Sequence, residues 1–129
     1  MAISEERVLA ILNAARSKSA ELGLRTTIAV VDDNGLLQGF LRMDGARHNT
    51  VHIAQGKAKG CAAVGRPTVE VAERASRPVF VYQTVHHGCI FAQGGVPVLE
   101  NGQFAGAVGV SGAADPNDDE AIAYAGANV

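Results

Sequence analysis

Apolar residues recur along the first part of the chain with the spacing of an amphipathic helix. Val8 and Ile11 begin a series that repeats every three or four positions, which places these side chains on one helix face. Ser4 can cap the start of this helix, and Gly23 follows its end. Residues 26–31, two threonines followed by four apolar residues, then predict a buried strand.

The segments that follow alternate between hairpins and helices. Asp33-Asn34-Gly35 has the residue types of a tight turn, so residues 36–43 are predicted to return as the second strand of a hairpin. The remaining predicted elements, in chain order, are a helix at 49–64, a short helix at 69–75, a strand or irregular segment at 79–85, a loop at 86–89, a short strand at 90–92, and a final helix that starts within 115–120.

A second hairpin is built almost entirely from small and β-branched residues. Residues 94–99 form its first strand, and Asn101-Gly102 is a strong signal for a hairpin turn because both positions tolerate positive φ. The returning strand carries Gly106, Gly109 and Gly112. Glycine weakens a strand unless another group approaches the backbone closely. This strand therefore packs against a helix at short range, or it forms the floor of a binding site.

The element order predicts an α+β fold. Consecutive antiparallel strands, with helices grouped between them, favour an antiparallel sheet with helices packed on it. The chain of 129 residues has the length of a single domain, 1–129. A domain of this size buries a core without needing a disulfide or a metal.

Composition and charge exclude several classes of function. The formal net charge is −2 and no basic stripe exists, which argues against nucleic-acid binding. No signal peptide and no apolar run of roughly 20 residues is evident, so no membrane partner is expected. Cys61 and Cys89 match no metal or redox spacing, and free buried thiols suit a cytoplasmic location. The abundance of glycine and alanine suits tight subunit contacts, so a homo-oligomer is expected.

Two adjacent histidines are candidates for catalysis. His86 and His87 directly precede the glycine hairpin. In an extended loop their side chains point to opposite sides, so one of them can face a pocket. Histidine titrates near neutral pH and binds transition metals and haem iron. The simpler interpretation is a pair of surface loop histidines.

A second histidine pair is a candidate metal site. His48 and His52 are four residues apart, the spacing of one helix face. The pair lacks a third ligand and the glutamate of a metalloprotease helix. A solvated helix start is the simpler interpretation.

Basic residues and glycine amides are candidates for binding an anion. Arg42, Arg47 and Lys57 can meet a carboxylate, and arginine does so with two parallel hydrogen bonds. Surface ion pairs explain these residues equally well. The backbone amides of Gly94 and Gly95 can form an anion-binding concavity or an oxyanion site.

Together these segments resemble the GlcG/HbpS family, also described as DUF336 or haem-degrading-domain-like. The resemblance covers nearly the whole chain and rests on the order and spacing of several short motifs. These are Val30-Val31-Asp32 with Gly35, Arg42-Met43-Asp44-Gly45-Ala46, Ala54 with Lys57-Ala58, Gly94-Gly95-Val96-Pro97 with Gly102, the glycine-rich run 106–113, and Asp119-Glu120.

The resemblance implies a profilin-like fold with a five-stranded antiparallel sheet flanked by helices. It also implies oligomers, and it links the chain to haem binding or to catabolic settings. Some haem-binding relatives use a histidine of the first helix as an iron ligand, but residues 4–22 contain no histidine. Haem would then require His48, His52, His86 or His87.

Two functions follow as alternatives. The first is a binding module for a small anionic ligand, with haem or another tetrapyrrole as one form of it. The second is a cofactor-free lyase, isomerase or hydrolase that acts on a small carboxylate or carbonyl intermediate. In the second, His86 or His87 serves as the acid or base, Arg42 positions the carboxylate, and amides at Gly94-Gly95 stabilise an enolate.

Overall fold

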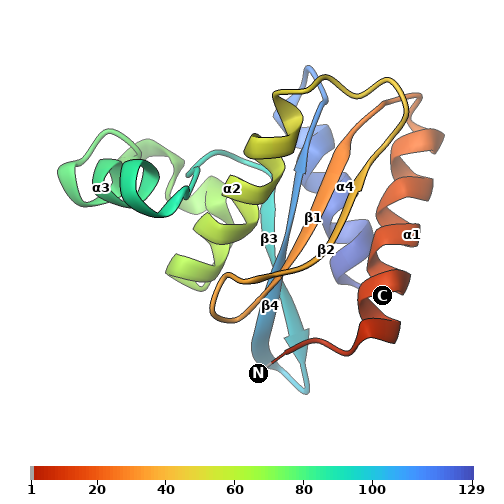
Figure 1. Ribbon diagram of the computed structural model, residues 1–129, viewed down its shortest axis with the longest axis horizontal. Helices are drawn as coiled ribbons and strands as arrows, with labels where there is room; N and C mark the ends of the chain where they lie inside the picture. The colour runs from red at the N-terminus through yellow and green to blue at the C-terminus, as the bar shows by residue number, and fades with distance from the viewer. Residues whose placement is uncertain (1) are drawn as a thin grey trace.

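The computed structural model describes residues 2–129, which form one antiparallel sheet with helices on both faces (Figure 1). The sheet has four strands in the order β2-β1-β4-β3. The strands are β1 (Thr27–Asp32), β2 (Leu37–Arg42), β3 (Gly95–Glu100) and β4 (Gln103–Ser111). The helices are α1 (Glu5–Glu21), α2 (Thr50–Val64), α3 (Pro78–His87) and α4 (Pro116–Ala127), with two short 3-10 turns, η1 (Thr68–Glu70) and η2 (Ala72–Arg74). The predicted α+β class is confirmed.

Each face of the sheet has its own core. Helices α1 and α4 cover one face, where Ile11, Ile28 and Val108 belong to a large buried cluster (Figure 1). Helix α2 covers the other face through small residues such as Ala54 and Ala58. Because alanine keeps the helix axis close to the sheet, this second layer is thin. Within residues 2–129 no helix is both long and apolar enough to cross a membrane.

Two glycines of the second hairpin, Gly95 and Gly109, allow helix α2 to pack closely on the sheet. A Cβ placed on Gly109 would overlap the Ala54 carbonyl oxygen of α2, and one on Gly95 would overlap the Lys57 carbonyl oxygen. Of the two explanations for the returning strand, helix packing at short range is therefore the correct one at Gly109. The predicted turn is confirmed, since Asn101 and Gly102 have φ of 51° and 77°.

The sheet has four strands among the described residues, not the five that the resemblance implied. The short strand predicted at 90–92 does not form. The amide of Ile90 donates to the Gly56 carbonyl of α2 (2.9 Å), and the Phe91 ring packs edge-on against Phe80, with centroids 4.7 Å apart. The backbone of this segment therefore bonds to a helix instead of a sheet edge. The profilin-like label stays a prediction.

Residues 79–85 form most of helix α3, which corrects the predicted strand or irregular segment. Pro78 occupies the first helical position and Gly88 ends the helix with φ of 71°, so local start and stop signals outweigh the β-branched side chains. His86 and His87 are consequently the last two residues of a helix rather than part of an extended loop. The argument that their side chains point to opposite sides was therefore wrong.

Candidate ligand-binding site

Three loops meet at one end of the sheet and enclose a polar pocket of about 550 Å³. They are the α1–β1 loop, the β2–α2 loop and the chain that leaves β4. We call this cavity the arginine pocket, and it is lined by Gly23, Leu24, Arg25, Gly45, Arg47, Asn49, Thr50, Ile53, Ser111, Gly112, Ala113 and Ala114.

Hydroxyl groups form the inner wall of the arginine pocket. Ser111 lies directly opposite Thr27 in the β1–β4 ladder, so the two side chains share one sheet face. The Thr27 hydroxyl is 2.7 Å from that of Thr50, which donates to the Arg47 carbonyl (2.6 Å). This chain of contacts ties the β2–α2 loop to the sheet and fixes the backbone at Arg47.

Two further contacts hold the loops in place. Arg42 donates through Nε and Nη2 to the Ala46 carbonyl (3.0 and 2.7 Å), so its guanidinium braces the loop that leads to Arg47. At the other wall Gly112 has φ of 138°, and a Cβ there would lie 2.7 Å from the Arg25 carbonyl oxygen. The chain leaving β4 can therefore run close beside Arg25 only if residue 112 is glycine.

The electrostatics of the arginine pocket favour an anion. Arg25 and Arg47 supply two guanidinium groups, and none of the described residues that line the pocket is acidic. Helix α2 begins here with no acid in its first turn, and the Asn49 side chain makes no capping hydrogen bond. The positive end of the helix dipole thus has no carboxylate within its own first turn. Asp115 follows Ala114, and its carboxylate caps α4 through the Asn117 amide (2.9 Å).

A buried ion pair lies beneath the pocket wall. Lys57 donates to the Val110 carbonyl (2.9 Å) and to Asp119 (3.2 Å), and both side chains are almost fully buried. The second oxygen of Asp119 accepts from the amide of Ala113, a pocket residue (3.0 Å). Burial raises the pKa of Asp119, opposed by the charge of Lys57. Lys57 was predicted to meet a ligand, but its ammonium is instead occupied inside the protein.

The predicted anion site at Gly94 and Gly95 is also occupied by internal contacts. The amide of Gly95 donates to the Thr68 hydroxyl (2.9 Å), and the carbonyl of Gly94 accepts from Val110 (3.0 Å). Both glycines are buried beneath α2 and η1. The Gly95 amide is therefore not available to an oxyanion, because a threonine side chain already accepts from it.

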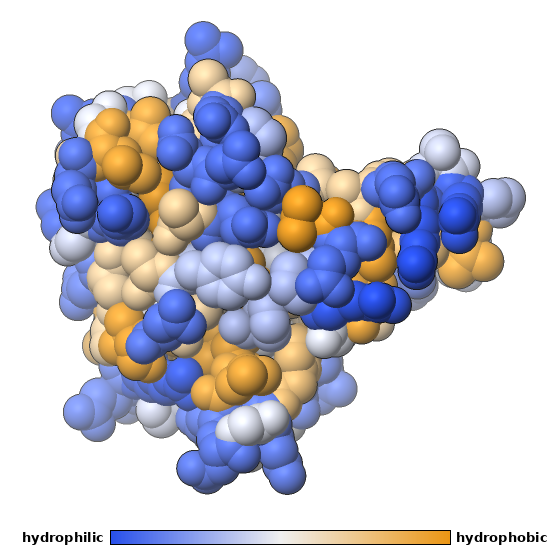
Figure 2. Space-filling model, turned by 180° about the vertical axis from the view of Figure 1, so that it is seen from behind, coloured by the Kyte–Doolittle hydropathy of each residue, from blue (hydrophilic) through white to orange (hydrophobic). Residues whose placement is uncertain are grey.

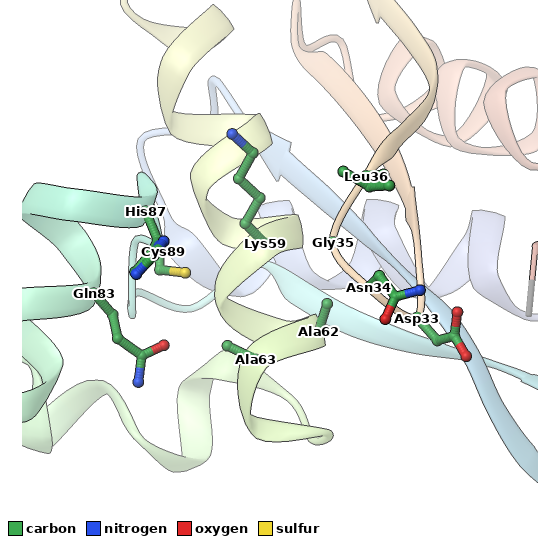
Figure 3. A pocket seen from close by; sticks show the side chains of 10 residues that line it. All are labelled: Asp33, Asn34, Gly35, Leu36, Lys59, Ala62, Ala63, Gln83, His87 and Cys89. Atoms are coloured by element: carbon green, nitrogen blue, oxygen red, sulfur yellow. The ribbon is translucent and has the colours of Figure 1, made fainter.

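A second cavity, the α2–α3 groove, has a volume of about 450 Å³. It is lined by Asp33, Asn34, Gly35, Leu36, Lys59, Ala62, Ala63, Gln83, His87 and Cys89. Figure 3 shows α2 between the other two walls, with the β1–β2 turn on one side and α3 on the other. His87 lines this groove, and Lys59 extends along it. Burial raises the pKa of the Cys89 thiol, which keeps it in the neutral form.

The other histidines do not join His87. His86 is exposed and stacks near the Tyr82 ring, with centroids 4.4 Å apart. His52 lines a separate cleft of about 240 Å³ beside α2, and His48 lies in the turn before that helix. Among residues 2–129 no group of three or more His, Cys, Asp or Glu side chains could hold a metal ion. The metal role of His48 and His52 therefore rests on the pair alone.

The structure does not gather the predicted site residues in one place. The arginine pocket and the α2–α3 groove share no lining residue. Arg47 lies in the first and His87 in the second, while Arg42 lines a small cavity of about 130 Å³ beside Arg16 and Arg25. The arrangement required for the cofactor-free enzyme is therefore not assembled within this chain.

Comparison with known proteins places the fold in a family. A family model described as "Haem degrading protein HbpS-like" matches residues 3–128. The chain belongs to the GlcG/HbpS family. Protein GlcG of Escherichia coli strain K12 is 34% identical over 111 residues, which are 84% of this chain and 81% of that protein.

Solved structures of GlcG/HbpS relatives agree with this fold. A double mutant of HbpS from Streptomyces reticuli has a TM-score of 0.89 and 31% identity, covering 99% of this chain and 86% of the other. Protein ORFY of Klebsiella pneumoniae, a DUF336 protein, has a TM-score of 0.86 and 26% identity over 98% of this chain and 88% of the other. The solved PduOC:heme complex has a TM-score of 0.86 at 21% identity over 99% of this chain and 94% of that chain, and this match supports the fold alone.

Within this GlcG/HbpS chain, sequence reasoning missed three residues of the arginine pocket. Arg25 carries no local signal, because a single arginine before a strand is usually a surface residue. Thr50 appeared only as part of a predicted helix, and Ser111 only as part of the glycine-rich run 106–113. The antiparallel register supplies the missing signal. Thr27 at the start of β1 pairs with Arg42 at the end of β2 and with Ser111 at the end of β4, so the loops that adjoin these three residues meet at one end of the sheet.

Proposed function

We propose that this GlcG/HbpS chain binds a small anionic ligand in the arginine pocket. The observation that carries the proposal is a cavity of about 550 Å³ with Arg25 and Arg47 on its wall and no acid among its described lining residues. Protein ligand pockets are commonly between about 300 and 1,000 Å³. The pocket thus suits a compact molecule with one or two carboxylate or phosphate groups.

The chemistry of the lining residues supports an oxygen-rich anion. Arginine presents a planar set of donors that matches two carboxylate or phosphate oxygens. The hydroxyl groups of Thr50 and Ser111 add neutral polar contacts at the inner wall. Both arginines are exposed, whereas the hydroxyl residues Thr50 and Ser111 are buried at the inner wall.

A thermal-shift assay with three probes tests this proposal. Oxalate, succinate and inorganic phosphate are each added to the protein, and the midpoint of unfolding is followed. A ligand at about 100 times its Kd stabilises the folded state by about 2.7 kcal/mol, which is about 10 °C for a chain of this length. At least one probe is expected to stabilise the wild type.

A charge-matched control separates the pocket from general charge effects. The double variant R25Q/R47Q should lose the stabilisation. The double variant R66Q/R77Q, which removes two exposed arginines that do not line the pocket, should retain it. The proposal fails if none of the three anions stabilises the wild type, or if R25Q/R47Q responds as the wild type does.

Haem is a second candidate ligand, and the α2–α3 groove is the site that suits it better. This groove offers an imidazole from His87, a ligand type that haem iron accepts, and an ammonium from Lys59 for a propionate. Leu36, Ala62 and Ala63 add apolar contacts for a macrocycle. The neutral Cys89 thiol is not the thiolate that haem iron takes, so His87 is the residue that would hold the iron. Bound haem would supply an iron centre for redox or oxygen chemistry.

Titration with hemin followed in the Soret region tests the haem candidate separately. The wild type and H52A should give the same shifted band, and H87A should lose it. A wild-type spectrum equal to that of free hemin, or an unchanged band in H87A, contradicts this assignment. Neither result bears on the arginine pocket, because the two cavities share no residue.

A further inference from the structure

The arginine pocket contains one buried hydroxyl group that the described part of the chain leaves without a partner. Thr50 donates its single hydroxyl proton to the Arg47 carbonyl, so Thr27 is the donor in the 2.7 Å contact between the two threonines. Ser111 lines the same wall and is 6% exposed. None of residues 2–129 forms a hydrogen bond with the Ser111 hydroxyl. Because buried polar groups are normally hydrogen-bonded, this hydroxyl indicates a ligand atom that accepts from it.

A smaller cavity adjoins the arginine pocket and shares Arg25 with it. We call it the outer cavity. It has a volume of about 130 Å³ and is lined by Arg16, Arg25, Leu41, Arg42, Met43 and Asp44. Liquid water occupies about 30 Å³ per molecule, so the outer cavity has room for about four waters or for one carboxylate group. It is too small for a whole ligand, but it suits one end of a molecule whose other end lies in the arginine pocket.

The charges around the outer cavity favour an anionic group. Three guanidinium groups face one carboxylate, that of Asp44, among its described lining residues. The Arg42 guanidinium already donates to the Ala46 carbonyl. Arg16 and Arg25 are exposed and form no ion pair with any described residue. A guanidinium has five N–H donors in a planar fork, so Arg25 has donors enough for an oxygen in each cavity.

The register of the sheet sets the distance between the two anion positions. Thr27 pairs with Arg42 on one side and with Ser111 on the other. Neighbouring strands lie about 4.8 Å apart, so the backbones of Arg42 and Ser111 are about 10 Å apart. Figure 1 shows the α1–β1 turn and the β2–α2 loop at this same end of the sheet. The end carbons of an extended five-carbon chain are about 5 Å apart, and the arginine side chains reach across the remaining distance.

We propose that the arginine pocket and the outer cavity together bind a linear dianion. One acidic group lies at Ser111 and Arg47, and the other lies between Arg25 and Arg16. This inference rests on the proposed function, because it requires an anion in the arginine pocket. It adds the class of ligand, a short molecule with an acid at each end, and a specificity residue, Arg16 of α1, which does not line the arginine pocket itself.

Isothermal titration calorimetry with glutarate and pentanoate tests the proposal. The two acids have the same number of carbons and are ionised at pH 8, but only glutarate has a second carboxylate. The dianion preference is the Kd of pentanoate divided by the Kd of glutarate at one ionic strength. The wild type should show a preference of about tenfold or more, which is the size expected when a charged group gains hydrogen bonds.

Two variants with opposite expected effects locate the second acid. R16Q should reduce the dianion preference about fivefold, the upper range for an exposed charge pair, and leave the Kd of pentanoate unchanged. D44N removes a carboxylate that repels the second acid, so it should raise the preference about twofold or more. A gain in affinity cannot come from a folding defect.

Two further variants complete the design. S111A should raise the Kd of both acids by the same factor, about fivefold, because both place a carboxylate at the inner wall. R77Q is the control for net charge. It removes an exposed arginine that directly precedes α3, and Figure 2 shows the α3 lobe projecting from the body of the molecule. R77Q should keep the wild-type preference.

The outcomes distinguish this proposal from the proposed function. If oxalate or phosphate stabilises the protein while glutarate binds no more tightly than pentanoate, the dianion proposal is overturned and the anion site stands. The dianion proposal is also overturned if R16Q or D44N keeps the wild-type preference, if R77Q lowers it as much as R16Q does, or if S111A leaves both Kd values unchanged. If no anion binds at all, both proposals fail.

Discussion

Replacing Gly109 with alanine should destabilise the fold far more than a strand glycine substitution usually does. Gly109 lies in β4 beneath α2, and the added Cβ would overlap the Ala54 carbonyl oxygen and lie 2.5 Å from the Ala58 amide nitrogen. Non-bonded carbon contacts are optimal at about 3.5–4.0 Å. Helix α2 must therefore withdraw from the sheet by about 1 Å, because backbone atoms cannot rotate away.

The size of the effect follows from two opposing contributions. Overpacking of a close-packed core costs about 1–3 kcal/mol of folding free energy. Because the obstructing atoms here are helix backbone, we expect a cost at or above the upper end of that range. Alanine recovers about 0.5–1 kcal/mol because it loses less conformational entropy than glycine. A net loss of about 3 kcal/mol is expected, which lowers the unfolding midpoint by about 11 °C in a chain of this length.

Gly39 in β2 supplies the matched control. A Cβ there would overlap Val8 Cγ1 and lie 3.1 Å from Leu12 Cδ1, so it meets side-chain atoms of α1 rather than backbone. The G39A variant should lose about 1–2 kcal/mol, because a side chain can move aside more easily than helix backbone. Urea unfolding of both variants and the wild type measures the difference. A G109A variant no less stable than G39A would refute the view that close helix packing selects glycine in this strand.

Three further predictions concern the interior. Lys57→Met should cost about 3–5 kcal/mol in urea unfolding, because it leaves the Asp119 carboxylate buried without its cation; a loss below about 1 kcal/mol would mean that the pair is not buried in solution. Thr68→Val should cost about 1–3 kcal/mol, since the Gly95 amide loses its acceptor, and unchanged stability would argue against that bond. Burial raises the pKa of Cys61 to about 12, so its thiol should stay neutral and unreactive toward a disulfide reagent at pH 8 until the chain unfolds; fast labelling of the folded protein would contradict its burial.

Local signals determined how much of the fold could be predicted. The Ser4 cap accepts from the Arg7 amide (3.2 Å), and the Asn101-Gly102 turn adopts the expected positive φ, because both depend on neighbours within a few residues. Helix α3 was mispredicted because its valines favour a strand, whereas its start and stop are set by Pro78 and Gly88. Terminal residues outweighed interior propensity there.

The candidate site could not be predicted because its contacts are long-range. Lys57 resembled a surface lysine, yet its partner Asp119 lies 62 positions further along the chain. Arg25 and Arg47 reach one pocket because β1 and β2 are antiparallel, with Thr27 opposite Arg42, so the chain before β1 and the chain after β2 emerge side by side. Only the register of the sheet reveals that the two arginines are close together. The glycine-rich hairpin alone does not indicate where along it a cavity forms.

A crystal structure of the protein soaked with the anion that stabilises it most tests the binding account directly. The account predicts that the anion lies in the arginine pocket, with guanidinium nitrogens of Arg25 and Arg47 about 2.7–2.9 Å from its oxygens. An anion bound with full occupancy elsewhere, while both arginines remain turned to solvent, would contradict it.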